Sequence, residues 1–249
     1  MSYKKYTPSD TYTYAFGMFP TLEALTHAPH LCRAVLYQSR ATKSEALTKI
    51  EALCEAHHIP FLLDEKTVSR LAPSDNTFVM TVVDKPATPL APHANHLVLV
   101  SPSDMGNLGT IFRTALGFGM THIALIQPCA DYHDPRAVRA SMGAIFSLHI
   151  NKYPTFEAYR AQFPHHTLYP TMTTSANPLA SVLFATPYAV IFGNESAGLP
   201  PEFATMGHAV VIPHTQRIDS LNLAVSVGIV LYHTALSDPS TGEKPIFSP

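Results

Sequence analysis

Three clusters of glycines and polar residues in the second half of the chain hold the side chains best suited to chemistry. The first cluster spans residues 101–120 and follows the apolar run 97–100. Asn107 can cap the helix that this cluster opens, Gly109 allows a close backbone approach, and Arg113 follows one turn later on the same face. Because parallel α/β proteins bind ligands at such strand ends, we expect Arg113 to point toward a site. A surface arginine on a capped helix is the structural alternative.

The second cluster is a glycine-bounded loop that follows the apolar run 188–192. Gly193 and Gly198 permit a tight loop whose backbone amides and carbonyls can hold a ligand. Glu195 lies inside this loop, where it could order the loop or bind an amine of a substrate. A plain strand-to-helix turn with an exposed carboxylate is the structural alternative.

The third cluster begins where the apolar run 209–212 ends at Pro213. Ser220 is well placed to cap the helix that follows, which is a purely structural role. A carboxamide in the first turn of an apolar helix needs a polar partner. Asn222 therefore indicates a partner either within the protein or on a ligand.

Several common chemistries lack their sequence patterns in this chain. The glycines form neither GxGxxG nor GK[ST], which argues against a dinucleotide site and against a P-loop. The histidine pairs 57–58 and 165–166 point in different directions on a helix or a strand, so we expect no metal site. The three cysteines match no zinc or redox spacing and are expected to be reduced and mostly buried thiols.

The elements that position the three clusters can be read from the apolar runs. In the second half, short apolar runs alternate with helical segments, which predicts βα units around a mostly parallel sheet covered by helices. The last helix is expected over residues 221–235. The runs that we interpret as strands of this sheet lie at 97–100, 123–126, 188–192 and 209–212.

The first part of the chain shows a second, smaller α/β pattern. The proline-containing stretch 85–95 separates it from the larger sheet. We therefore predict a small α/β domain at 1–88, a linker at 89–95, a larger α/β domain at 96–237 and a tail at 238–249. In the small domain, helices are expected at 21–26, 43–57 and 66–71, and strands at 33–38, 61–63 and 78–83.

Composition fits an ordinary soluble protein, with 46% hydrophobic and 14% charged residues. No apolar segment follows Lys4 and Lys5, and no run is long enough to span a bilayer. We therefore expect a cytoplasmic protein without membrane association.

The formal net charge of −2 gives no overall basic footprint for nucleic acid, although a local patch can exist on a nearly neutral chain. Arg136, Arg139 and Arg217 are candidates for phosphate contacts, with solvated surface positions as the alternative. Tyr12 and Tyr14 are candidates for stacking on bases, with packing roles as the alternative.

Taken together and in this order, the three clusters resemble the SpoU/TrmH branch of the SPOUT superfamily of RNA ribose methyltransferases. The resemblance covers about residues 97–232, and the segment 139–144 also looks like the stretch between the first two motifs of this family. The N-terminal part is similar, more weakly, to the small ribosomal-protein-like RNA-binding domain that often precedes the catalytic domain. The matching positions are Asn107, Gly109, Arg113, Phe192, Gly193, Asn194, Glu195, Gly198, Ile212, Pro213, Ser220, Leu221 and Asn222.

The resemblance implies a C-terminal trefoil knot that wraps S-adenosylmethionine between the second and third motifs, and a site completed in a homodimer. It implies transfer of the methyl group to a ribose 2′-hydroxyl of tRNA or rRNA. It also implies a catalytic group of Arg113, Asn107, Glu195, Ser220 and Asn222. Cofactor contacts are implied for Phe192, Gly193, Gly198, Ile212, Pro213 and Leu221.

The role of the arginine needs a physical qualification. A guanidinium is normally protonated at neutral pH, so Arg113 is better suited to bind a phosphate and stabilise a developing alkoxide than to act as a base. His214 and Gln216 stand where the family commonly has methionine and glycine. The alternatives are a knotted protein that binds RNA or cofactor without methyl transfer, and methylation of a base by the same fold.

Overall fold

The structure is a computed structural model that describes residues 3–41, 44–85, 88–215 and 217–237. The chain forms two compact units, each of which draws on more than one segment. The first comprises the described residues of Met1–Ala87, Met105–Arg113 and Asp131–Ser147. The second comprises those of Thr88–Asp104, Thr114–Ala130 and Leu148–Pro249.

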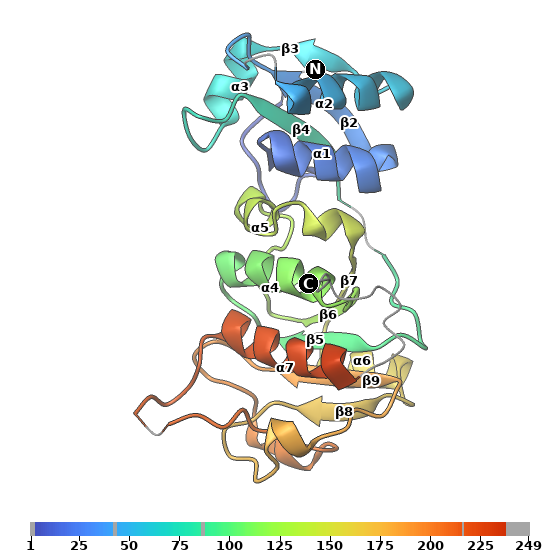
Figure 1. The fold of residues 1–249 in the computed structure, drawn as a ribbon, viewed down its shortest axis with the longest axis vertical. Coiled ribbons are helices and arrows are strands. Elements are labelled where there is room, and N and C mark those ends of the chain that lie inside the picture. Colours follow the sequence, from blue (N-terminus) through green and yellow to red (C-terminus); the bar gives the residue numbers. More distant parts are fainter. Residues whose placement is uncertain (1–2, 42–43, 86–87, 216, 238–249) are drawn as a thin grey trace, which may run out of the picture. The chain divides into compact units, whose positions relative to one another are not determined.

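The first unit is built on a four-stranded sheet of strand order β1-β4-β2-β3. Strands β2, β3 and β4 of this sheet are labelled in Figure 1. Strand β4 pairs antiparallel with both β1 and β2, whereas β3 adds to β2 in parallel. Val68, Met80 and Val82 are fully buried in the core beside this sheet. The elements are β1 (Tyr12–Phe16), α1 (Met18–His27), η1 (Pro29–Leu31), β2 (Cys32–Tyr37), α2 (Glu45–Ala56), β3 (Phe61–Leu63), α3 (Glu65–Leu71) and β4 (Val79–Asp84).

Local sequence explains where the helices of this unit begin. The Ser44 hydroxyl accepts a hydrogen bond from the Leu47 N–H, and the Asp64 carboxylate accepts one from the Thr67 N–H, so both residues act as N-caps. Helix α1 is longer than the predicted 21–26. Lys43, where we expected α2 to begin, lies outside the described residues.

Two later segments complete the first unit. They are the start of α4 (Met105–Gly117), and α5 (Pro135–Ala140) with the short helix η2 (Ala144–Ser147). A Cβ at Gly109 would overlap the Ala140 side chain and the Ala137 carbonyl oxygen, so the backbone of α4 lies directly against α5. The Thr13 hydroxyl of β1 donates to the His133 carbonyl oxygen, which links the N-terminal sheet to the segment before α5.

The second unit is built on a five-stranded sheet of order β7-β6-β5-β9-β8, in which every pair is parallel. This confirms the predicted parallel sheet, whose central strands are almost fully buried. Among the described helices, none combines the length and apolar character needed to cross a bilayer. The elements are β5 (His96–Val100), β6 (His122–Ile126), β7 (His149–Tyr153), α6 (Phe156–Gln162), β8 (Thr167–Pro170), η3 (Leu179–Ser181), β9 (Tyr188–Phe192), η4 (Pro201–Thr205) and α7 (Leu223–Ser237).

The prediction of a strand over 209–212 was wrong. Val210 pairs with the end of β8, where its N–H donates to the Pro170 carbonyl and its carbonyl accepts from the Met172 N–H. Val211 pairs instead with the segment 177–179. The segment therefore changes partner after a single residue, which gives two isolated bridges and no ladder.

Candidate functional site

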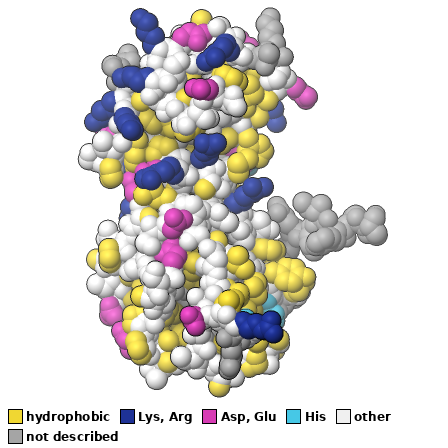
Figure 2. Space-filling view, turned by 90° about the vertical axis from the view of Figure 1, so that its left-hand side faces the viewer, with side chains coloured by type: hydrophobic (Ala, Val, Ile, Leu, Met, Phe, Trp, Pro, Cys, Tyr) yellow, Lys and Arg dark blue, Asp and Glu magenta, His cyan; other side chains and the backbone are white. Residues whose placement is uncertain are grey.

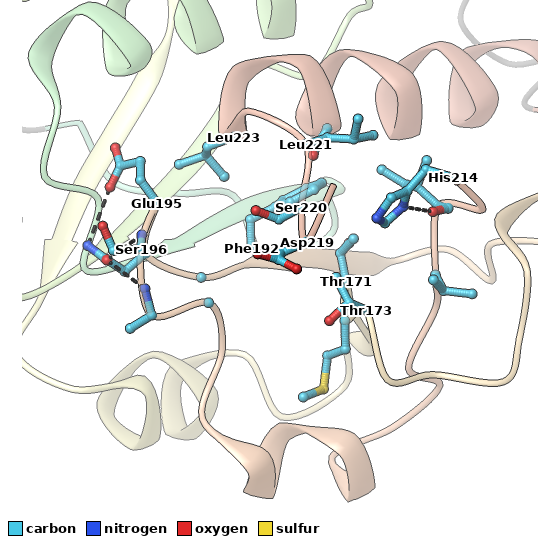
Figure 3. A pocket seen from close by; sticks show the side chains of 18 residues that line it. Thr171, Thr173, Phe192, Glu195, Ser196, His214, Asp219, Ser220, Leu221 and Leu223 are labelled. Atoms are coloured by element: carbon cyan, nitrogen blue, oxygen red, sulfur yellow. Dashed lines mark hydrogen bonds between the residues drawn. The ribbon is translucent and has the colours of Figure 1, made fainter. Parts of the chain in front are cut away.

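A cavity of about 300 Å³ lies in the second unit, at the carboxyl end of β9 (Figure 3). Its walls come from the segment after β8, the loop after β9, the segment 211–214 and the residues that lead into α7. Segments of the second and third sequence clusters thus meet in one place. The lining residues are Thr171, Met172, Thr173, Phe192, Gly193, Asn194, Glu195, Ser196, Ala197, Gly198, Val211, Ile212, His214, Asp219, Ser220, Leu221, Leu223 and Ser226.

The loop after β9 closes on itself through backbone and side-chain hydrogen bonds. The Gly198 N–H donates to the Asn194 carbonyl at 2.9 Å, and the Asn194 N–H donates to the Gly198 carbonyl at 3.2 Å. The Asn194 side-chain oxygen also accepts from the backbone N–H groups of Ser196 and Ala197. A Cβ at Gly193 would overlap the Gly198 carbonyl group, and Gly198 has a φ of +67°. Both glycines are therefore required by the backbone path, as the sequence predicts.

Glu195 orders this loop by binding the connection between β5 and α4. Its carboxylate accepts hydrogen bonds from the Ser103 backbone N–H at 3.0 Å, the Ser103 hydroxyl at 2.8 Å and the Asp104 backbone N–H at 3.1 Å. Partial burial raises the pKa of this carboxyl, but these hydrogen bonds outweigh that effect and hold the pKa below its ordinary value. The Asn194 carboxamide adds a bond to the Ser101 carbonyl at 2.8 Å.

The start of α7 differs from the prediction. The helix begins at Leu223, and the Asn222 side-chain oxygen accepts from the Ala224 N–H at 2.9 Å and the Val225 N–H at 3.3 Å. Asn222 therefore caps the helix, and the prediction of Ser220 as the N-cap was wrong. The polar partners that we expected for Asn222 thus include backbone N–H groups at the start of its own helix. Ser220 lines the cavity instead.

Helix α4 carries Asn107, Gly109 and Arg113. It begins at Met105, so Asn107 lies within the first turn of the helix. The prediction that Asn107 caps this helix was therefore wrong. Gly109 is buried against α5, and the Arg113 side chain is exposed. Asn107, Arg113 and Asn222 are not among the residues that line the cavity.

The structure brings most of the predicted cofactor residues together. Phe192, Gly193, Gly198, Ile212 and Leu221 all line the cavity, whereas Pro213 does not. The His214 ring nitrogen Nδ1 lies 2.8 Å from the Ile212 carbonyl oxygen, to which it donates. Gln216 lies outside the described residues.

Sequence reasoning missed several lining residues. Thr171 and Thr173 follow β8, a four-residue strand that ends in proline and gave no clear apolar run. Asp219 stands directly before Ser220 and could have been found from that position.

The acidic side chains of the described lining residues are not balanced by lysine or arginine. Glu195 and Asp219 are its carboxylates, and no lysine or arginine occurs among the described residues of the lining. Such a cavity attracts a cationic ligand and disfavours an anionic one. Nowhere in the described part of the chain do three or more His, Cys, Asp or Glu residues form a group that could hold a metal ion.

Comparisons with known proteins agree with the resemblance seen in the sequence. The chain is 37% identical over 147 residues to an uncharacterized tRNA/rRNA methyltransferase of Synechocystis, over 57% of this chain and 53% of that protein, so it spans about half of that relative. It is 28% identical over 232 residues to the 23S rRNA (uridine(2479)-2′-O)-methyltransferase of Streptomyces viridochromogenes, over 87% and 79% of the two chains.

A solved structure of an AdoMet-bound rRNA methyltransferase from Sinorhizobium meliloti superimposes with a TM-score of 0.77 at 26% identity, over 90% of this chain and 87% of that one. The sequence model described as the SpoU rRNA Methylase family matches residues 94–232, which is more than half of the chain. The parallel sheet, the loop after β9 and the segment that leads into α7 all lie inside the matched range. The chain therefore belongs to the SpoU rRNA methylase family.

Proposed function

We propose that this protein transfers a methyl group from S-adenosylmethionine to a ribose 2′-hydroxyl of tRNA or rRNA. The observation that carries the proposal is the cavity in which the second and third sequence clusters meet, with two carboxylates and no cationic side chain among its described lining residues. S-adenosylmethionine carries a sulfonium charge, which suits this electrostatic environment. The family match and the names of the relatives support the same reaction.

The residues present fit such a cofactor. The loop 193–198 has no room for a Cβ at Gly193, so its backbone can approach a ligand closely. Phe192 and Leu221 supply apolar walls, and Ile212 offers its backbone from the other side. We place Gly198 and Pro213 in the same binding group, Pro213 because it fixes the path of the chain after Ile212. The cofactor would supply an electrophilic methyl group.

We assign the ribose chemistry to Arg113 and its supporting residues. The exposed guanidinium of Arg113 binds a phosphate beside the target ribose and stabilises the alkoxide that develops on the 2′-oxygen. Asn107, Ser220 and Asn222 orient this arginine and the substrate. Glu195 acts indirectly, because its carboxylate holds the loop that lines the cavity.

We further propose that the C-terminal segment forms a trefoil knot in a domain of residues 96–237. The hydrogen bonds of Val210 and Val211 support this, since the chain passes between the segment after β8 and the segment 177–179 and bonds to both. The tail, residues 238–249, lies outside the described residues. Residues 1–88 would form the RNA-binding domain and residues 89–95 the linker.

We propose a homodimer that forms through α7. Val225, Ile229, Tyr232 and Leu236 follow one another at helical spacing, and 52%, 37%, 52% and 67% of their surfaces are exposed. Such a continuous apolar stripe on one helix is typical of an interface. A second copy of this chain presents the same stripe and can cover it through a two-fold contact. We expect the dimer to act in the cytoplasm, where its RNA substrates occur.

The reaction is tested by incubating the protein with methyl-labelled S-adenosylmethionine and with separate tRNA and rRNA fractions, followed by digestion to nucleosides. A labelled 2′-O-methyl nucleoside supports the proposal. Label on a base would assign the fold to base methylation. Cofactor binding without transfer to either RNA class would identify a binding protein.

A further inference from the structure

Two carboxylates line the cavity at the end of β9, here called the cofactor cavity, and they differ in what they bind. Glu195 uses both of its side-chain oxygens within the protein: Oε2 accepts from the Ser103 N–H and hydroxyl, and Oε1 accepts from the Asp104 N–H. Asp219 is exposed and forms no hydrogen bond or ion pair within the part of the chain that the structure describes. The charge of Asp219 is therefore available to a ligand.

No cation among the described residues is paired with Asp219. The described lining of the cavity contains no lysine or arginine. Arg217 lies two residues before Asp219 and is exposed, but it forms no ion pair with this carboxylate. On the face drawn in Figure 2, the Lys and Arg side chains gather mainly over the upper part, whereas the lower part shows mainly hydrophobic, uncharged and acidic side chains. The negative charge of Asp219 is thus left for a positive ligand to neutralise.

Asp219 shares the cavity with apolar side chains. Phe192 and Leu223 line the same cavity and are 2% and 8% exposed. In Figure 3 the Asp219 side chain is drawn centrally, with Glu195 on the left and His214 on the right. A ligand that fills the cavity displaces water from this carboxylate, which strengthens the attraction of the carboxylate for a positive charge. Asp219 therefore favours a cationic ligand over a neutral ligand of nearly the same shape.

The proposed reaction removes a positive charge from the ligand of this cavity. Methyl transfer breaks the bond between the methyl carbon and sulfur and leaves that electron pair on sulfur. It forms a bond between the methyl carbon and the ribose 2′-oxygen, whose proton passes to water. The sulfonium of S-adenosylmethionine thereby becomes the neutral thioether of S-adenosylhomocysteine. Apart from the methyl group, charge is the feature by which a binding site can distinguish these two molecules.

We propose that Asp219 makes the cavity selective for S-adenosylmethionine over S-adenosylhomocysteine, because its carboxylate faces the sulfonium charge. The inference rests on the proposed function, since it takes S-adenosylmethionine as the ligand of this cavity. Once the methyl group has been transferred, the attraction between Asp219 and the sulfonium is lost, so the product dissociates more readily than the cofactor. Asp219 is thus a specificity-determining residue of the reaction.

The test compares the Kd values of three ligands by calorimetric titration of the full chain. S-adenosylmethionine carries a sulfonium, sinefungin carries an amine in place of the methylated sulfur, and S-adenosylhomocysteine has no charge at this position. Asp219→Asn keeps the size of the side chain and removes its charge. The variant is expected to bind the two charged ligands about tenfold more weakly and to bind S-adenosylhomocysteine as the wild type does. Added salt should reduce the preference of the wild type for the charged ligands.

Two further variants serve as controls. Asp219→Glu keeps the negative charge and should retain the preference for the charged ligands. Glu202→Gln removes an exposed carboxylate of the same unit outside the cavity and should leave all three Kd values unchanged. Thermal unfolding of each variant checks that it folds. Because Asp219 is exposed and forms no hydrogen bond to a described residue, Asp219→Asn should unfold at the temperature of the wild type.

Two outcomes would overturn the inference alone: an equal loss of affinity for all three ligands in Asp219→Asn, which would assign the carboxylate to a group that they share, or wild-type affinity for both charged ligands in this variant. A wild-type protein that binds none of the three ligands would reject the inference together with the proposed function. Selectivity that depends on Asp219 in a protein that transfers no methyl group to RNA would leave the inference in place and reject the proposed function alone.

Discussion

The Glu195 carboxylate binds Ser103 at two points, the backbone N–H at 3.0 Å and the hydroxyl at 2.8 Å. Ser103 belongs to the connection that leads from β5 into α4, and Glu195 belongs to the loop that lines the cofactor cavity. The first and second sequence clusters are therefore joined by hydrogen bonds to a charged acceptor, which are stronger than bonds between neutral groups.

Glu195→Gln should weaken both the loop and cofactor binding. A carboxamide has one acceptor oxygen and two N–H donors, so one of the N–H groups of Ser103 and Asp104 would face another donor. We expect a loss of about 1–3 kcal/mol in the free energy of unfolding and a weaker Kd for S-adenosylmethionine. Urea denaturation and calorimetry measure the two effects. Glu202→Gln, at an exposed position of η4, is the control and should change neither.

The lowered pKa of Glu195 also makes the stability of the folded protein depend on pH. The folded-state pKa lies below the ordinary value of 4.5, so the stabilisation is present above pH 4.5 and is lost as the pH falls through the folded-state pKa. Glu195→Gln should therefore lose less stability than the wild type under acid conditions. Equal losses in both proteins would contradict the lowered pKa of Glu195.

Gly193→Ala should abolish tight cofactor binding. The added Cβ would overlap the Gly198 carbonyl group, so the loop must open by moving its backbone. Gly117→Ala serves as the control, because a Cβ there meets nothing within 4 Å. Calorimetric titration with S-adenosylmethionine compares the two proteins. Wild-type affinity in Gly193→Ala would show that the loop plays no part in binding.

Arg113→Ala should remove methyl transfer and leave cofactor binding unchanged. Loss of a group that stabilises developing negative charge costs about 10²–10³ in kcat. Arg160→Ala changes an exposed arginine of α6 and should retain activity. Single-turnover transfer assays with saturating cofactor measure the effect. A variant that keeps more than about a tenth of the rate would exclude the proposed role.

His96 should make the protein less stable in mild acid. Its Nδ1 lies 2.9 Å from the Tyr159 hydroxyl and its Nε2 lies 3.0 Å from the Ala91 carbonyl oxygen, in a fully buried position. Burial lowers the pKa of this imidazole from 6.5 to about 4, and the neighbouring His166 and His122 act in the same direction. The unfolded chain therefore binds a proton more readily than the folded chain between these values.

The free energy of unfolding should consequently fall by about 3 kcal/mol as the pH is lowered from 6.5 to 4. His96→Gln can keep both hydrogen bonds without titrating, so its stability should depend less on pH. His30→Gln, at an exposed position, should follow the wild-type curve. Denaturation at a series of pH values checks this, and parallel curves for wild type and His96→Gln would refute it.

Tyr232→Glu should convert the proposed dimer into a monomer, because it places a charge in the middle of the apolar stripe on α7. Leu183→Glu is the control, since Leu183 is 83% exposed but lies outside α7. Sedimentation velocity of both variants and of the wild type measures the oligomeric state of each protein. A wild-type protein that sediments as a monomer would reject the dimer.

The sequence predicted the strands whose run of apolar residues matches the burial that they have in the fold. β5, β6 and β9 are continuous apolar runs, which is what burial on both faces of a parallel sheet requires. β7 and β8 were not predicted, because HINKY mixes polar and apolar residues at the edge of the sheet and TLYP is short. β7 is only partly buried, with the pattern exposed–buried–intermediate–exposed–buried, whereas β8 is mostly buried but too short to give a clear run.

Other features depend on contacts that no local pattern encodes. The run 209–212 has a strand composition, but its hydrogen bonds go to two different segments. Ser220 and Asn222 are both good capping residues, and the bonds of Asn222 to Ala224 and Val225 decide between them. Glu195 was recognised as significant, whereas its partner Ser103 was not, because the two lie far apart in the chain.

The close contact between Gly109 and α5 fixes how far apart two arginines of the first unit begin on their helices. Arg113 is one turn beyond Gly109 on α4, and Arg136 is in the helix against which Gly109 is buried. Apart from the methyl group of Ala140, only backbone atoms of α5 meet Gly109, so the backbone positions of Arg113 and Arg136 have little freedom to move apart. If both arginines bind phosphates of one RNA, the spacing between those two phosphates is set by the protein. Substrate choice would then follow the shape of an RNA loop more than its base sequence.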